Sequence, residues 1–291
     1  MRAFFYGNWG YGLFAVALCI EAALQQQVAL NGPLYHAITF LAVVVFYNHA
    51  YRGHATDGGN DDRARWYAVH GRTQRGVQLV LVALLAICCA WAMNRTWERL
   101  LGMGWHHLVL FVVFPAVGAA YYGTGKVGLR QVGWLKPFVL GFVWAGVVTV
   151  FPVLVRCLLD GSSVPDVGVS VRLFFKNMMF VAVLAVLFDI KDHAGDHRNS
   201  LRTFVVQRGL RTTLFRIVLP LTLLGLITFL GYGAVSGFSS LKLLLNTVPF
   251  IALVAVIYAL RKRRSILYYL VVVDGLMLVK AVCGSVAMRW F

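Results

Sequence analysis

Three aspartates in one short run of the sequence could hold a metal ion. Asp189, Asp192 and Asp196 follow a long apolar segment with the spacing D-x-x-D-x-x-x-D. On a helix, this spacing places the three carboxylates on one narrow stripe. Carboxylate oxygens gathered where a membrane helix meets water are ligands that Mg²⁺ prefers, and Mg²⁺ can bind a phosphate group at the same time. We therefore predict that these aspartates bind the metal and take part in catalysis.

The alternative for this stripe is a solvated helix end, at which the acids only offset nearby Lys191, Arg198 and Arg202. Acids at the C-terminal end of a helix oppose its dipole, at about 0.3–1 kcal/mol per charge. The chain also has only 11 acidic residues against 27 Lys and Arg, so three acids in one run stand out. The placement therefore favours a functional site over a solvated end.

The elements that must position this stripe are membrane helices. The chain has 291 residues, of which 60% are hydrophobic, and a mean hydropathy of +0.74. Apolar stretches long enough to cross a bilayer recur throughout it. We predict an all-α, polytopic membrane protein with one integral domain over residues 1–291 and about nine spans. The expected spans are 10–30, 33–51, 76–94, 100–122, 135–157, 170–189, 213–233, 239–260 and 265–288.

The net charge of +16 is concentrated in alternate connections between these spans. Most Lys and Arg residues fall in 52–75, 122–136, 190–212 and 261–264. The positive-inside rule places these connections and the N-terminus in the cytoplasm, and we expect the inner or plasma membrane of a bacterium. Basic loops at a membrane surface favour anionic lipid headgroups and phosphorylated substrates, so we expect membrane lipid and no nucleic acid as partners.

The motifs resemble those of the UbiA-type intramembrane prenyltransferases. The run from Asp189 to Asp196 is similar to the second aspartate-rich motif of that family, and Tyr122 and Lys126 match its Y-x-x-x-K pattern. The resemblance implies a bundle of nine helices around a central cavity, in which two motifs face each other and bind a prenyl diphosphate through Mg²⁺. It further implies that Asn48 orients this donor and that Lys126, with Arg202, supports the leaving group.

Several further side chains in or near these motifs could also have a functional role. Tyr122, Lys191 and Arg198 are predicted to contact the substrate. Lys126, Arg130 and Lys136 form a basic cluster whose ordinary role would be to set the topology. Of that cluster we favour only Lys126 as a functional residue.

The first aspartate-rich motif of the family is altered in this chain. The pattern N-D-x-x-D-x-x-x-D falls on residues 48–56, where Asn48 is kept and His49, Arg52 and Thr56 replace the acids. We therefore expect fewer or weaker metal sites, or a different headgroup. Arg52 and His54 could bind phosphate without a metal, because Arg pairs with phosphate oxygens through two hydrogen bonds. Arg52 could equally be an anchor at the membrane surface.

Acids elsewhere in the chain leave further alternatives open. Asp57, Asp61 and Asp62 could supply displaced oxygen ligands if their loop folds back, although a solvated loop suits them as well. Glu21, Asp274 and Lys280 lie within apolar spans, where ionisable residues usually face the bundle interior. Glu21 could contact an acceptor substrate or have a structural role.

We predict an enzyme that transfers a prenyl group from a prenyl diphosphate to a membrane-soluble, lipophilic acceptor with help from Mg²⁺. A terpene cyclase of the same type would capture the allylic cation within the donor itself. A non-catalytic relative that binds an isoprenoid or another lipid is the competing class, and the altered first motif favours it. A transporter is a weaker alternative, because no pair of broken spans stands out in corresponding halves.

Overall fold

The computed structural model describes residues 1–56, 62–122, 132–162, 166–198 and 202–291, without the side chains of 52–56, 122 and 194–198. All regular elements in these residues are helices. The first part of the chain forms α1 (Arg2–Tyr6), α2 (Trp9–Gln25), α3 (Pro33–Thr56), α4 (Asp62–Leu101) and α5 (Trp105–Tyr122). The middle part forms α6 (Lys136–Ala145), η2 (Gly146–Val150), α7 (Phe151–Asp160) and α8 (Val167–Arg198).

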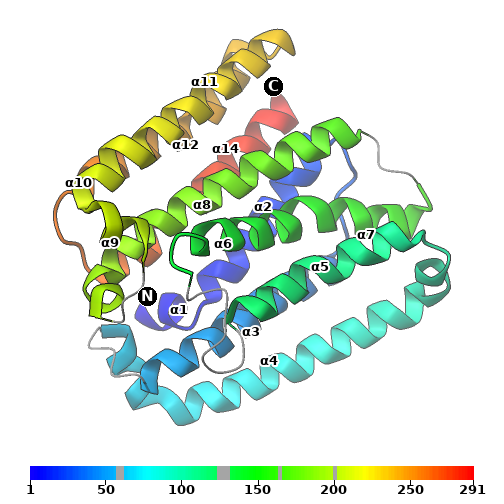
Figure 1. The fold of residues 1–291 in the computed structure, drawn as a ribbon. Helices are drawn as coiled ribbons and strands as arrows, with labels where there is room; N and C mark the ends of the chain where they lie inside the picture. Colours follow the sequence, from blue (N-terminus) through cyan, green and yellow to red (C-terminus); the bar gives the residue numbers. More distant parts are fainter. Residues whose placement is uncertain (57–61, 123–131, 163–165, 199–201) are drawn as a thin grey trace.

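The last part of the chain continues the bundle. Its elements are α9 (Phe204–Arg208), α10 (Leu210–Thr212), η3 (Thr213–Val218), α11 (Leu219–Val235), α12 (Ser240–Ala259), α13 (Ile266–Tyr268), η4 (Tyr269–Val273) and α14 (Leu276–Trp290). The η elements are π-helical turns that join the helices on either side of them. In Figure 1, α11 and α12 lie along one side of the bundle, α4 lies along the opposite side, and α8 and α6 lie between them.

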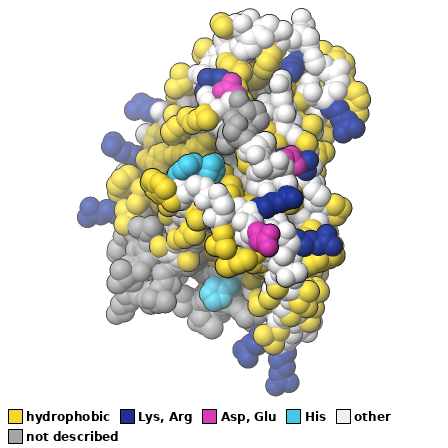
Figure 2. All heavy atoms as spheres, turned by 90° about the vertical axis from the view of Figure 1, so that its right-hand side faces the viewer, with side chains coloured by type: hydrophobic (Ala, Val, Ile, Leu, Met, Phe, Trp, Pro, Cys, Tyr) yellow, Lys and Arg dark blue, Asp and Glu magenta, His cyan; other side chains and the backbone are white. Residues whose placement is uncertain are grey.

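The predicted all-α membrane bundle is confirmed. Each predicted span overlaps a helix in the described residues. Six of these helices are long and apolar enough to cross a membrane, and 9–25 and 105–121 are shorter apolar helices, so the count of nine spans is not confirmed. The apolar surface fits a lipid environment, because Leu79, Ile87, Leu224 and Ile251 are all more than half exposed. Figure 2 shows hydrophobic side chains spread over one face of the molecule and few acidic ones.

The core lies where α2, α8, α12 and η4 meet. Its fully buried side chains include Leu18, Leu187, Ile257 and Val273. Close approach of the helices depends on small residues, as is common in membrane bundles. A Cβ atom on Gly141 of α6 would lie 2.4 Å from the Met178 carbonyl oxygen of α8. Glycine therefore allows α6 and α8 to pack backbone to backbone.

One helix is much longer than its predicted span. The hydropathy pattern predicted a span over 76–94, whereas α4 runs from Asp62 to Leu101 and is about 60 Å long at 1.5 Å per residue. The added N-terminal part is polar, but Arg63 and Tyr67 within it are buried. Both side chains donate hydrogen bonds to the Tyr6 carbonyl oxygen at the end of α1. Tertiary contacts thus hold a helix in a stretch that the hydropathy pattern assigns to a loop.

Candidate functional site

The acidic stripe lies near the C-terminal end of α8. Asp189 is buried, with 2% of its surface exposed, and Lys136 at the start of α6 forms an ion pair with its Oδ1 atom. Asp192 is half-buried, and its Oδ1 atom lies 2.6 Å from the Nζ atom of Lys191. The backbone of Asp196 belongs to the same helix, but its side chain lies outside the described residues. The two carboxylates that the structure describes are therefore each paired with a lysine.

Among the described residues of the second connection, Lys136 is a basic residue that reaches this stripe. The close packing of α6 on α8 at Gly141 explains its position, because it brings the first turn of α6 alongside the last turns of α8. From the sequence we favour Lys126, which lies outside the described residues, over Lys136. Nothing in the sequence distinguishes Lys136 as the partner of Asp189, since any lysine that begins an apolar span looks like a topology-setting residue.

Arg202, the other predicted leaving-group residue, has an exposed side chain. Its backbone carbonyl accepts a hydrogen bond from Gln207 Nε2 at 3.3 Å. A Cβ atom on Gly133 would lie 2.5 Å from the carbonyl carbon of Arg202, so the segment before α6 lies directly against the segment before α9. The structure thus brings the second and third basic connections together through their backbones.

Asn48 marks the other side of the candidate site. It is 3% exposed on α3, and its Oδ1 atom accepts a hydrogen bond of 2.7 Å from Asn8 Nδ2. Asn8 lies between α1 and α2 with a φ angle of 65°, a left-handed conformation that asparagine tolerates better than most residues. The Tyr67 hydroxyl lies 3.4 Å from the same oxygen of Asn48. Helices α2, α3 and α4 therefore meet at one amide group.

Arg63 completes this group, which we call the Arg63 cluster: Asn8, Asn48, Arg63 and Tyr67. Arg63 is 4% exposed, and its guanidinium group donates a hydrogen bond to Asn8 Oδ1. Its carbon atom lies 3.6 Å from the centre of the Tyr51 ring, a cation–π contact. Arg52 and His54, which the sequence suggests as phosphate-binding residues, have side chains outside the described residues. The same holds for the side chains of Tyr122 and Arg198.

The Arg63 cluster contains buried hydrogen-bond donors that have no partner among the described residues. These are Nε and Nη1 of Arg63 and Nδ2 of Asn48. Buried polar groups in proteins are nearly always hydrogen-bonded, and an unsatisfied one costs about 1–3 kcal/mol. All three atoms are donors, so a ligand that satisfies them must present acceptors. A phosphate or carboxylate group has that property.

Asp274 connects the Arg63 cluster with the acidic stripe. It follows the π-helical turn η4, and its N–H donates to the Tyr269 carbonyl oxygen at 2.9 Å. Its Oδ2 atom accepts a hydrogen bond of 2.6 Å from the Tyr11 hydroxyl. Asp274 also lies within electrostatic range of both Arg63 and Lys191. Arg63 and Lys191 are thus both close enough to interact electrostatically with one buried acidic residue.

Aromatic rings line the same region. Tyr11 and Tyr47 are stacked with ring centres 4.3 Å apart, and Tyr47 and Tyr51 are stacked at 6.2 Å. Trp144 of α6 donates a hydrogen bond of 2.8 Å from Nε1 to the Tyr47 hydroxyl. Since Tyr51 also contacts Arg63, the rings extend from the Arg63 cluster into the apolar core. Electron-rich ring faces of this kind attract cations.

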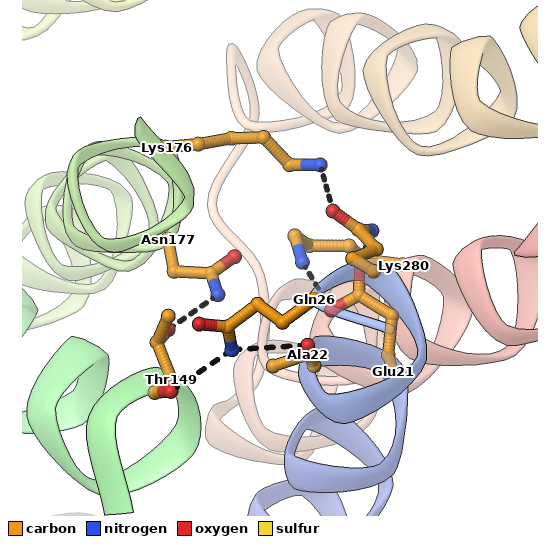
Figure 3. Close-up of polar contacts among 8 residues, drawn as sticks. Glu21, Ala22, Gln26, Thr149, Lys176, Asn177 and Lys280 are labelled. Carbon is orange, nitrogen blue, oxygen red and sulfur yellow. Dashed lines mark hydrogen bonds and ion pairs between the residues drawn. The ribbon is translucent and has the colours of Figure 1, made fainter. Parts of the chain in front are cut away.

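A second polar cluster lies further along the bundle, away from the stripe (Figure 3). Lys280 Nζ lies 2.7 Å from Glu21 Oε2, and both side chains are buried. Lys176 donates to Gln25 Oε1 at 2.9 Å. Lys176 precedes Asp189 by 13 residues of α8, or about 20 Å along the helix axis. Glu21 thus has an ion pair that ties α2 to α14, which favours the structural role over contact with an acceptor.

The acidic stripe fits Mg²⁺ in ligand type. Asp189 and Asp192 supply the oxygen atoms that the ion prefers, and they lie one helical turn apart. Among the residues that the structure describes, there is no group of three His, Cys, Asp or Glu residues that could hold a metal ion. Asp57 and Asp61 lie outside those residues, and Asp62 pairs with Arg65 at 3.4 Å on the surface. Displaced ligands from that loop stay a prediction.

Comparison with known proteins supports the fold. Neither a protein-family model nor a curated protein matches the sequence. A solved structure, described as giving "structural and mechanistic insights into the biosynthesis of Digeranylgeranylglyceryl phosphate synthase in membranes", matches with a TM-score of 0.57. The match covers 96% of this chain and 94% of that chain at 13% sequence identity. The chain therefore shares the overall fold of that protein. The all-α membrane bundle expected from the sequence is thus confirmed as a fold, and the chain is an integral membrane protein.

Proposed function

We propose that the chain transfers a prenyl group from a prenyl diphosphate to a lipophilic acceptor in the membrane. One observation carries the proposal. Three buried hydrogen-bond donor atoms of Arg63 and Asn48 lack partners among the described residues. They lie where the altered first motif would meet the prenyl diphosphate. A diphosphate would satisfy these donors through its oxygen atoms, and Arg can bind two of them at once.

Residues from both sides of the site would bind the diphosphate and stabilise it as the leaving group. Arg63 and Asn48 would hold the diphosphate from one side, and Lys136 and Lys191 would hold it from the other. When the C–O bond breaks, its electron pair stays with the diphosphate, and these fixed positive groups stabilise the added charge. The acceptor then forms the new bond to carbon and releases a proton. The stacked rings of Tyr11, Tyr47 and Tyr51 would shelter the allylic cation between the two steps.

Magnesium is part of this proposal through the acidic stripe. Asp189 and Asp192 would hold the ion, with Asp196 on the following turn. When bound, Mg²⁺ supplies further positive charge to the departing diphosphate. The carboxylates would have to exchange their lysine partners for the ion, which frees the lysines to contact phosphate oxygens.

A non-catalytic lipid-binding protein is the second candidate. The observation that favours it is that Asp189 and Asp192 are each already paired with a lysine. In such a protein the stripe would be a set of structural ion pairs, and the Arg63 cluster alone would bind the phosphate of an isoprenoid. Binding without bond cleavage would be its signature.

Diphosphate release tests the two candidates. The full chain in detergent would be incubated with geranylgeranyl or farnesyl diphosphate, with and without Mg²⁺, and both bound donor and free diphosphate would be measured. A transferase or cyclase releases diphosphate when Mg²⁺ is present, and the organic products distinguish the two. Binding without release in the presence of membrane extract as a source of acceptors supports the lipid-binding protein.

The variant Asp192→Ala tests the metal role within the same experiment. We expect it to abolish Mg²⁺-dependent release, while binding of the donor in the absence of Mg²⁺ is unchanged, because Arg63 and Asn48 remain. Asp62→Ala is the matched control, since it removes a surface carboxylate. Full release by the Asp192 variant would contradict the proposed metal site.

A further inference from the structure

A pocket of about 490 Å³ lies outside the candidate site, between the start of α10 and the turn that joins α12 to α13. Four basic side chains line it: Arg211, Arg261, Lys262 and Arg264. None of the described residues that line it is acidic. The pocket therefore gathers four positive charges from two segments that are about 50 residues apart in the sequence.

The inner wall of this pocket is apolar. Leu214 of η3 is fully buried there, and the rings of Phe215 and Tyr258 meet edge to face with centres 5.4 Å apart. Tyr258 is 50% exposed, so its ring forms part of the outer surface. The pocket is thus amphipathic, with a basic rim and an aromatic and aliphatic wall.

Arg264 is held in place within the rim. Its Nε atom donates a hydrogen bond of 3.1 Å to the Ala259 carbonyl oxygen at the end of α12. Its guanidinium carbon lies 5.0 Å from the centre of the Tyr268 ring. A fixed guanidinium group loses less entropy on binding than a free side chain does.

The position of the pocket indicates its ligand. It lies where the apolar helix α12 ends and the basic turn begins, the level at which lipid headgroups meet water. Four like charges repel one another, and an anion between them removes that repulsion. Basic pockets between membrane helices are known binding sites for phosphorylated headgroups.

We propose that this pocket binds the phosphate headgroup of an anionic membrane lipid, with the hydrocarbon chain against Phe215 and Tyr258. The site shares no residue with the acidic stripe or the Arg63 cluster. It goes beyond the proposed transferase activity and does not depend on it. A free phosphate ion would use the rim but would gain nothing from the apolar wall.

Native mass spectrometry of the full chain in detergent tests this site with three probes: dioleoyl phosphatidic acid, dioleoylglycerol and inorganic phosphate. We expect the wild-type chain to retain phosphatidic acid in preference to dioleoylglycerol. The double variant Arg261→Gln/Arg264→Gln should weaken this binding at least about tenfold, because two charge-assisted contacts are lost. Arg211→Gln/Lys262→Gln tests the same rim from α10 as well as from the turn, in case the first variant misfolds.

Arg72→Gln/Arg75→Gln is the matched control, because it removes two exposed charges from α4 outside the pocket. We expect it to bind phosphatidic acid as the wild type does. Equal losses in the control and pocket variants would overturn the proposal, as would equal retention of dioleoylglycerol. Displacement of phosphatidic acid by an equal concentration of inorganic phosphate would overturn the lipid assignment.

Discussion

The two motif regions of the bundle have opposite charge chemistry. At the end of α8, Asp189 and Asp192 are acidic and each is paired with a lysine. On α3, neutral Asn48 is linked to Arg63 through the Asn8 amide, and three donor atoms of Asn48 and Arg63 have no partner among the described residues. Among the described residues, the carboxylates on one side of the site thus have partners within the protein, while three hydrogen-bond donors on the other side do not.

This difference supports the proposal that the Arg63 side of the site binds a phosphate directly. A phosphate that approached the α8 side would have to compete with carboxylates for the lysines, unless a cation joined it. At the Arg63 cluster it would satisfy donors that are already desolvated. Under the proposed function, direct contacts from Arg63 and Asn48 to the phosphate would take the place of a metal-bridged contact on this side of the site.

The largest expected effect is on the α8 side. Lys136→Met would leave the buried Asp189 carboxylate without its lysine, which should lower the stability of the protein by about 3–5 kcal/mol. The double variant Lys136→Met/Asp189→Asn should recover most of this loss, because no buried charge is left unpaired. Unfolding in detergent, followed by circular dichroism, measures both. A double variant no more stable than Lys136→Met would show that the ion pair does not form.

A smaller effect is expected from Asn48→Ala on the Arg63 side. The change removes one hydrogen-bond donor to the ligand and the oxygen atom that accepts a hydrogen bond from Asn8. Binding of the prenyl diphosphate should therefore weaken by about 1–3 kcal/mol, or roughly 5- to 150-fold. Binding of geranylgeranyl diphosphate by calorimetry measures this. Asn246→Ala, which loses only a hydrogen bond to the Lys242 carbonyl oxygen, is the matched control. Unchanged binding in the Asn48 variant would remove this side chain from the site.

The third effect, on stability and not on binding, concerns the close contact between the two basic connections. Gly133→Ala places a Cβ atom against the backbone of Arg202 and Thr203, so one of the two segments must shift, at about 1–3 kcal/mol. Gly71→Ala, where the added atom meets open space, is the control. Thermal unfolding compares the two. Equal midpoints would show that the two segments do not pack together in the folded protein.

The sequence predicted the bundle and the stripe because both depend on local patterns. Long apolar runs predict membrane helices, and the spacing of Asp189 and Asp192 places them on one helix face. Arg63 was missed because it lies in a polar stretch that reads as a loop, and only packing against Tyr6 and Asn8 makes that stretch a buried helix.

The partners of the intramembrane charges could not be predicted either. Glu21 and Lys280 were both recognised as costly residues, but they are 259 positions apart and their ion pair depends on how α2 meets α14. In the same way, nothing local distinguished Lys136 from Lys126. Contacts between distant segments follow from the packing of helices, which hydropathy and spacing do not specify.

The measurement that tests this account most directly is binding of geranylgeranyl diphosphate to the full chain in EDTA, without divalent cations. We predict that the wild-type chain binds, and that Arg63→Gln weakens binding roughly 30-fold or more, because a buried charged contact is lost. Arg65→Gln is the matched control, since Arg65 is an exposed arginine in the same turn of α4. Its binding should equal that of the wild type. Equal binding by the Arg63 variant, or no wild-type binding until Mg²⁺ is added, would contradict direct recognition of phosphate by the Arg63 cluster.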